Sequence, residues 1–419
     1  MRGWQIWLGV VAGLVVGPGV SRGELTLTPP GDPNRNWSAA LLTTAGYNDN
    51  INTTPSVASS NRQESATIVV EPQATLRLPG ARTSGQLRYA YSAVYYNERN
   101  GSKPDESHLV DTSLTHNLTP RLTLSLSDAL RRGIEPDLVE QQISGTPLIT
   151  RRRGGYYYNT LNGGVNLALT ERLSLSLNQS WTRWWFDDPA QSETNDRDEY
   201  GTLFSTSYAL TPRTFVGGSY RFSLTSFSEA SATNELRDST SHAMYATMVH
   251  RFSPLVVGQI NAGIQLAGFT GQTDLGPYVN LGGSYNFSAR STLGAGFSYN
   301  IQLTEVAAYR SSEQATTYLS LNHRLTRRIG TALSFAYVLG TYQNLNPLYR
   351  NPDDITQKTS VAEDSWRVSA TVTYDFTRWA ALYLNYTYNE VSSGLDNPIT
   401  NTFRSFDRNQ LNAGLRLTY

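Results

Sequence analysis

Apolar and polar residues alternate one by one along most of this chain. Leucines at every second position are separated by serines and threonines after Arg121, and a similar run follows Arg172. Because successive side chains of a β-strand point to opposite faces, a period of two predicts strands rather than helices. The pattern is clearest in residues 122–127, 173–178, 329–337, 366–374 and 382–388. The chain is therefore predicted to be all-β.

A short turn recurs between the alternating stretches. Its commonest form is Leu or Phe, then Thr or Ser, then a variable residue, then Arg. Copies lie at residues 78–81 (the loosest), 118–121, 169–172, 210–213, 252–255, 287–290, 325–328 and 376–379. The interval between copies leaves room for two strands and one longer connection, so the repeat indicates a series of hairpins.

Nine longer, polar connections alternate with these eight turns. They cover residues 48–63, 97–105, 133–154, 187–197, 228–237, 270–274, 305–312, 343–362 and 392–404. Short turns on one side and long loops on the other are typical of outer-membrane barrels, in which the turns are periplasmic and the loops external. Nine loops and eight turns join about eighteen strands, and an even count places both termini in the periplasm.

Other all-β folds fit this pattern less well. A propeller needs four strands in each repeat, whereas two are readable here. A sandwich exposes one face of each sheet to water, where Leu, Tyr and Trp in every strand are not expected. In a membrane barrel these residues face lipid, polar residues face the lumen, and closure leaves no unpaired edge. We therefore predict one antiparallel, up-and-down transmembrane β-barrel over residues 36–419, after a short periplasmic segment at 24–35.

The first residues are a predicted secretory leader. Arg2 supplies a positive charge, an apolar run extends from Trp4 to Gly17, and small residues precede a cleavage site after Gly23. Residues 1–23 are therefore predicted to be removed. Charged residues make up only 16% of the chain, with 34 basic and 34 acidic, and there are no cysteines. This composition excludes a basic nucleic-acid-binding surface, a disulfide framework and thiolate metal sites.

The histidines form no catalytic or metal-binding pattern. His116, His250 and His323 each stand two residues before the last apolar residue of a predicted strand, so one repeated structural position explains all three. His108 and His242 lie near external strand ends, and no nucleophile is paired with them. Neither Gly-x-Ser-x-Gly nor His-Glu-x-x-His occurs. We predict neither an enzyme nor a bound metal or cofactor.

Lumen-facing positions carry more arginine than acid. The arginines are Arg77, Arg88, Arg221, Arg251, Arg324, Arg367 and Arg416, and the clearest acids are Glu71, Asp111 and Asp375. This excess predicts a weakly anion-preferring bore, since rings of charge select ions in pores. The alternative is that the arginines pair with the lumenal acids and stiffen the wall.

The connection at 133–154 has arginines at both edges. Arg131 and Arg132 precede it, and Arg151, Arg152 and Arg153 end it. The planar guanidinium fork suits carboxylate or phosphate. The loop is predicted either to fold inward as a basic constriction for an acidic sugar or phosphate, or to remain outside and bind lipopolysaccharide phosphates. Together with Arg88, Arg221 and Arg367, these five arginines are the candidate pore-lining residues.

Two short motifs point to an outer-membrane family. The chain ends with Leu411, Leu415, Leu417 and the terminal Tyr419 in alternation, similar to the β-signal read by the outer-membrane assembly machinery. The first strand ends Gly46-Tyr47-Asn48-Asp49-Asn50. This pentapeptide, followed by a long run of hairpins, resembles the family of outer-membrane β-barrel porins called type 2.

The resemblance implies an outer-membrane porin of a Gram-negative bacterium and carries no catalytic residues. The predicted function is passive passage of small polar, anionic or sugar-like solutes. The alternatives are an exit barrel for an exopolysaccharide export system and a structural barrel without an open pore. The expected partners are outer-membrane lipids, lipopolysaccharide, the assembly machinery and, for the export alternative, a polysaccharide.

Overall fold

A computed structural model of the chain describes residues 35–54, 62–99, 103–134, 138–140, 147–149, 155–228, 237–304, 308–345, 360–394 and 404–419. The predicted leader at 1–23 lies outside the described residues, as does nearly all of the predicted segment at 24–35.

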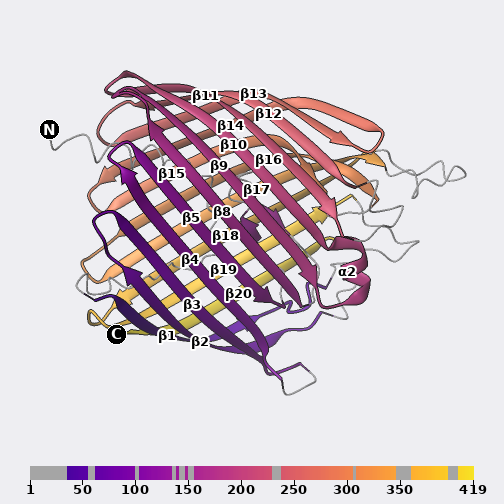
Figure 1. Cartoon of the computed structure of the whole chain (residues 1–419). Helices are drawn as coiled ribbons and strands as arrows, with labels where there is room; N and C mark the ends of the chain where they lie inside the picture. Colours follow the sequence, from indigo (N-terminus) through magenta and orange to yellow (C-terminus); the bar gives the residue numbers. More distant parts are fainter. Residues whose placement is uncertain are drawn as a thin grey trace, which may run out of the picture.

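Eighteen antiparallel strands form one sheet that closes on itself, as the sequence predicted (Figure 1). They are β1 (Trp37–Asn48), β2 (Ser65–Leu78), β3 (Thr83–Tyr96), β4 (Asp105–Thr119), β5 (Leu122–Gly133), β8 (Tyr156–Ala168), β9 (Leu173–Phe186), β10 (Arg197–Thr211), β11 (Thr214–Phe227), β12 (Ser239–Arg251), β13 (Val256–Phe269), β14 (Gln272–Ser288), β15 (Ser291–Leu303), β16 (Tyr309–Arg324), β17 (Ile329–Leu345), β18 (Val361–Asp375), β19 (Ala380–Ser393) and β20 (Phe406–Thr418). Each strand pairs with its neighbours along the chain, and β1 pairs with β20 to close the barrel.

The connections divide the barrel into two ends, which we call the turn end and the loop end. All eight predicted short turns lie at the turn end, where the first strand begins and the last strand finishes (Figure 1). The loop end carries the longer connections. These include a small hairpin of β6 (Leu138–Glu140) and β7 (Pro147–Ile149), and the short helix α2 (Pro189–Asn195).

A hydroxyl explains why the turn sequence repeats. In the turn after β4, the Thr119 hydroxyl accepts the backbone N–H groups of Arg121 and Leu122 at 3.2 and 3.0 Å. The Thr or Ser at the second position makes the same kind of bond in the six later turns. Short polar side chains that bond the backbone two or three residues on are turn formers. The loosest copy has Pro79 at this position instead.

Two local expectations are corrected. The predicted long loop at 270–274 is a two-residue turn, because Phe269 pairs directly with Gln272 and Gly271 takes a φ of 78°, which suits glycine. Residues 272–274 therefore belong to β14. Proline cannot donate to a ladder and is normally confined to edges, strand starts and bulges, so Pro72 and Pro277 predict shortened or bulged strands. Instead, β2 and β14 are continuous and keep one register with β1 and β13.

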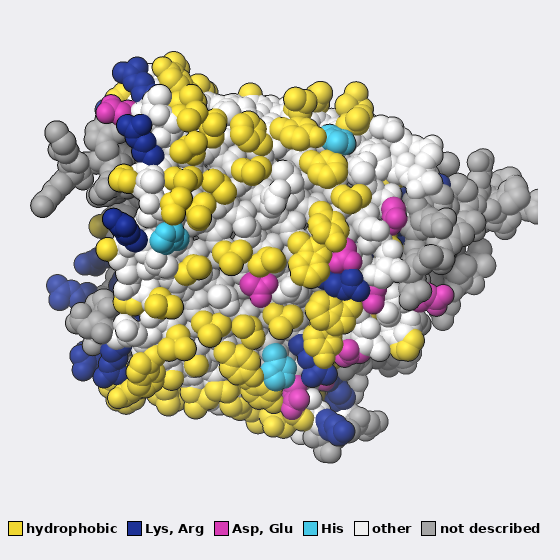
Figure 2. Space-filling model, viewed as in Figure 1, with side chains coloured by type: hydrophobic (Ala, Val, Ile, Leu, Met, Phe, Trp, Pro, Cys, Tyr) yellow, Lys and Arg dark blue, Asp and Glu magenta, His cyan; other side chains and the backbone are white. Residues whose placement is uncertain are grey.

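The outer surface is apolar between the two ends of the barrel. Large apolar side chains of one parity are exposed on nearly every strand, among them Leu76, Leu126, Met244, Ile264, Leu333 and Leu384. Figure 2 shows this band, with basic residues at both ends of the barrel and acidic residues mainly toward the loop end. A closed barrel with an apolar exterior is suited to lipid, because pairing of the first strand with the last leaves the sheet without a free edge strand. The fold is a transmembrane β-barrel.

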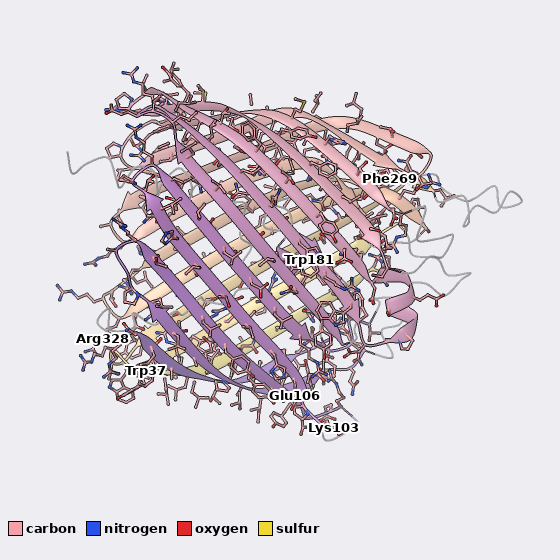
Figure 3. All side chains as sticks on the ribbon, in the orientation of Figure 1. Trp37, Lys103, Glu106, Trp181, Phe269 and Arg328 are labelled. Atoms are coloured by element: carbon pink, nitrogen blue, oxygen red, sulfur yellow. The ribbon has the colours of Figure 1, made fainter. Side chains whose placement is uncertain are left out.

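Tyrosines and carboxylates mark the loop-end edge of the apolar band. Tyr91 donates to Glu106 at 3.0 Å, Tyr299 to Glu313 at 2.7 Å and Tyr388 to Glu390 at 2.8 Å. In Figure 3, Glu106 lies at the loop end, whereas Trp37 and Arg328 lie at the turn end. Aromatic residues with a polar tip are enriched where a membrane meets water.

The predicted histidine position is confirmed. His116, His250 and His323 each lie opposite the first residue of the preceding strand and share a hydrogen bond with its hydroxyl. The partners are Thr83 at 2.8 Å, Thr214 at 2.9 Å and Ser291 at 2.6 Å. These histidines lie on different hairpins and do not converge.

The pentapeptide 46–50 holds the seam between the first and last strands. The Asp49 carboxylate accepts bonds from Arg62 at 2.6 Å and from the backbone and side chain of Asn409 at 2.7 and 2.8 Å. Arg62 also pairs with Asp407 at 2.9 Å. Asn50 is fully buried and donates to the Asp407 carbonyl. We call Asp49, Asn50, Arg62, Asp407 and Asn409 the seam clasp.

At the other end of the seam, the terminal residue completes the ladder. Tyr419 exchanges backbone hydrogen bonds with Ala39, and its ring lies 5.3 Å from that of Trp37. Leu411, Leu415 and Tyr419 are exposed on the outward face. The β-signal residues therefore occupy the closing strand, and the seam is held at both ends.

We expect Arg62→Gln to destabilise the folded barrel by about 1–3 kcal/mol, because it leaves two partly buried carboxylates without their shared cation. Urea unfolding of the reconstituted protein, followed by the different gel mobilities of folded and unfolded barrel, measures the change. Arg213→Gln, in an exposed turn, is the control. An Arg62→Gln midpoint equal to that of the control would show that the clasp does not stabilise the seam.

Candidate functional site

The lumenal face is built mainly from small polar residues. Inward positions of β8 and β9 carry Thr160, Asn162, Ser180 and Thr182, and the Thr160 and Thr182 hydroxyls bond each other at 2.9 Å. Such a surface binds water and polar solutes through hydroxyl and amide groups. Any site of chemical interest is therefore defined by the charged and aromatic residues that interrupt this surface.

The loop-end portions of β15, β16 and β17 leave the wall and lie on the lumenal face of the β13–β14 hairpin. The inward-facing Gln265 of β13 donates to the Ile301 carbonyl at 2.8 Å and accepts the Ile301 N–H at 3.0 Å. The inward-facing Asp274 of β14 accepts bonds from Ser311 at 2.9 Å and Asn344 at 2.6 Å. We call the described residues 300–304 and 308–312 the inward segment.

Apolar contacts and a further arginine fasten the inward segment. Ile301 and Leu303 pack against Ala267 and Phe269 on the lumenal face of β13. Phe269 is labelled near the loop end in Figure 3. Arg310 donates to the carbonyl of Thr270, in the β13–β14 turn, at 2.9 Å. The segment therefore narrows the bore on this side of the barrel.

Pro277 stands where β15 separates from β14. Their ladder runs from the turn end and stops at the Val279–Tyr299 pair, whereas β13 continues to pair with β14 as far as Gln272. Proline has no N–H to donate to a neighbouring strand. The ladder is therefore interrupted on the side of β15, next to Pro277, while β14 itself stays continuous.

A pocket of about 130 Å³ lies between the inward segment and the wall formed by β8 to β13. Three arginines and one glutamate line it, with hydroxyl and amide side chains between them. The charged residues are Arg197, Glu199, Arg221 and Arg237. Of these, the sequence identified only Arg221. Arg197 and Arg237 are the last residues of the predicted loops at 187–197 and 228–237, and Glu199, just after the first of these loops, was not singled out, so strand periodicity did not reveal them.

Two of the pocket arginines are held by neighbouring groups. Arg197 pairs with Glu199 at 2.7 Å and lies 5.0 Å from the ring of the buried Trp184. Arg237 is almost fully buried, donates to the Thr304 carbonyl of the inward segment at 3.3 Å and lies 4.2 Å from the Phe227 ring. These contacts fix the side chains that form the outer part of the pocket.

Arg221 has a different environment. Its guanidinium lies 5.9 Å and 5.2 Å from the ring centres of Tyr245 and Tyr278, which stack on each other at 4.6 Å. Gly263 lies between the two tyrosines in the sheet, and any side chain there would collide with Tyr245. Among the described residues, no carboxylate forms an ion pair with Arg221. Its positive charge therefore reaches the pocket without a neutralising partner in this part of the chain.

The other predicted pore-lining residues are not brought together with Arg221 in this pocket. Arg88 faces the lumen and pairs with Asp111 at 2.8 Å, and Arg367 and Arg131 are also on inward positions of β18 and β5. Arg132, one residue on, points to the outward face and lies 5.5 Å from the Tyr157 ring, which stacks on Trp185. It does not line the bore. Arg151, Arg152 and Arg153 lie outside the described residues.

Both predicted roles of the lumenal arginines therefore occur, at different places: some pair with acids of the wall, and one contributes unpaired charge. Arg88 with Asp111 and Arg416 with Asp375 are pairs that stiffen the wall. Arg221 is the arginine that contributes uncompensated charge to a pocket. Within the described residues, the inward segment of β15 and β16 narrows the bore. Most of the 133–154 connection, for which a constriction was predicted, lies outside the described residues.

Neither a metal centre nor a membrane-spanning helix is found in the described part of the chain. No group of three or more His, Asp or Glu side chains there is arranged to hold an ion. No helix of that part is long and apolar enough to cross a bilayer.

The sequence matches no protein-family model and no curated protein. Among solved structures, the chain is similar to the FrpB iron transporter of Neisseria meningitidis (F5-1 variant; 10% identity, 92% of this chain and 83% of that one, TM-score 0.47). It is also similar to the siderophore receptor PirA of Pseudomonas aeruginosa (9% identity, 91% of this chain and 80% of that one, TM-score 0.43). A third similar structure is the alcaligin outer membrane receptor FauA of Bordetella pertussis (13% identity, 92% of this chain and 76% of that one, TM-score 0.41). No residue role is transferred from these proteins.

We expect Gln265→Ala to raise the single-channel conductance of the reconstituted barrel. The change removes two hydrogen bonds, each worth about 0.5–1.5 kcal/mol, that hold Ile301 against β13, so the inward segment obstructs the bore less. Gln259→Ala, on the same face of the same strand nearer the turn end, is the matched control. Equal conductance in Gln265→Ala, the control and the wild type would show that the segment does not limit the current.

Proposed function

We propose that this chain is an outer-membrane barrel of a Gram-negative bacterium through which small polar solutes pass by diffusion, with a preference for anions. The apolar exterior, the short turns at one end and the longer connections at the other support the membrane location. The terminal Tyr419, paired into the seam, is consistent with a β-signal. Membership of the type 2 porin family is part of this proposal and rests on the pentapeptide and the hairpin pattern.

The observation that carries the proposal is the position of Arg221. A barrel of this strand number is wide enough for an aqueous channel, and the inward segment places one wall of the bore opposite Arg221. A cation without a described carboxylate partner attracts anions and repels cations at that point. The hydroxyl-rich lining supplies hydrogen bonds to uncharged parts of a solute.

We expect Arg221→Gln to lower the ratio of anion to cation permeability, because it removes this charge and keeps a polar side chain of similar length. The reversal potential of the protein in a planar bilayer with asymmetric salt measures the ratio. Arg213→Gln, in a turn outside the bore, should leave it unchanged. If Arg221→Gln has the reversal potential of the wild type, the pocket does not set ion preference.

A second candidate function has its own supporting observation. Two lumenal tyrosines have their rings over glycines of a neighbouring strand: Tyr318 over Gly296 and Tyr383 over Gly414. Flat aromatic surfaces between neutral polar groups suit a sliding sugar chain, which favours an exit barrel for an exopolysaccharide. Steady open current from the purified protein supports the diffusion channel, whereas a barrel without current supports gated export or a structural role.

A further inference from the structure

The pocket beside Arg221 has the features of a specific binding site. We propose that it binds a monosaccharide that carries one carboxylate, such as a hexuronate, with Arg221 holding the carboxylate. The inference rests on the proposed function, because it names the class of solute for which the bore has a site.

The side chains around Arg221 leave its guanidinium able to bind a ligand. The side chains of Tyr245 and Tyr278 surround the guanidinium, and because both are neutral they do not cancel its charge. Arg221 lines the pocket, and among the described residues no carboxylate forms an ion pair with it. A guanidinium in this state can donate two parallel hydrogen bonds to a carboxylate, the geometry in which arginine is most selective.

The charge of the lining favours a single negative charge. Arg197 is neutralised by Glu199 at 2.7 Å, and the Glu199 side chain also lines the pocket. Arg237 is almost fully buried, so Arg221 is the pocket arginine whose charge a solute can reach. Like charges close together repel strongly where water is partly excluded. A phosphate, which carries more than one negative charge near neutral pH, would meet this carboxylate as well as Arg221. A carboxylate needs one cation, and Arg221 supplies it.

The remaining lining matches a polyhydroxylated ring. Ser223, Thr225 and Ser241 present hydroxyls from β11 and β12, and Asn300 and Gln302 present amides from the inward segment. Hydroxyl and amide groups both donate and accept, as sugar hydroxyls do. Because Asn300 and Gln302 belong to the inward segment, they reach the pocket only because β15 leaves the wall and crosses the lumenal face of β13.

The test is ligand-observed NMR with the full-length protein, folded in detergent micelles, using D-galacturonate, D-galactose and inorganic phosphate as probes. We expect D-galacturonate to bind saturably and D-galactose and phosphate to bind at least about tenfold more weakly, since each lacks one of the two required features. Arg221→Gln should weaken D-galacturonate binding by about tenfold or more. Arg88→Gln, in the lumen but outside the pocket, should not change it.

Arg221→Lys serves as a second variant, because it keeps the charge and loses the planar fork. It should weaken D-galacturonate binding less than Arg221→Gln, and it tests the site even if the Gln variant does not fold. Equal affinity for D-galacturonate and phosphate, unchanged binding in both Arg221 variants, or no saturable binding would overturn the inference. Because binding is measured without current, a conducting barrel that binds no D-galacturonate would refute only this inference, and a non-conducting barrel that binds it would refute only the channel.

Discussion

The whole structure depends on one requirement: every backbone N–H and C=O group that faces hydrocarbon must have a partner within the sheet. Lipid offers no hydrogen bonds, and an unpaired group there costs several kcal/mol. A sheet meets the requirement only if its first and last strands pair, which here are β1 and β20. The ion pairs of the seam clasp and the tilted ring contact between Trp37 and Tyr419 lie at the two ends of this seam. The pentapeptide 46–50 is thus explained by closure of the barrel before any role in transport is considered.

Much of the fold followed from the sequence because the barrel is built from local rules. The alternation that put Leu126 outside and Ser127 inside depends only on strand geometry, and the turn hydroxyls act within three residues. The number of strands, the turns and the histidine positions were therefore predictable. The turn at Gly271 was missed because a cluster of polar residues, Gln272 to Asp274, was taken for a loop, although pairing with β13 places it in a strand.

The candidate site was less predictable because it depends on contacts between distant parts of the chain. Nothing in the local sequence of Asn300 to Thr304 shows that Gln265, more than thirty residues earlier, will bind its backbone. The signal that could have been read was Pro277, at the point where β15 loses its neighbour. Arg132 shows the opposite difficulty: its neighbour Arg131 faces the lumen, and a one-residue offset reverses the face. A run of arginines says how much charge is present but not on which side of the wall it lies.

The separation of β15 from β14 also locates the membrane. Beyond Val279 towards the loop end, the edge of β14 that faced β15 has lost its neighbour in the ladder. Such an edge is tolerated in water or headgroups but not in hydrocarbon, so the apolar core of the bilayer must end at or below Val279 on this side. From there to Ser288 the strand has about ten residues, the length that a tilted strand needs to cross. Tyr299, paired with Val279 and bonded to Glu313, marks the same level. A change in strand pairing thus fixes the depth at which the barrel sits in the membrane.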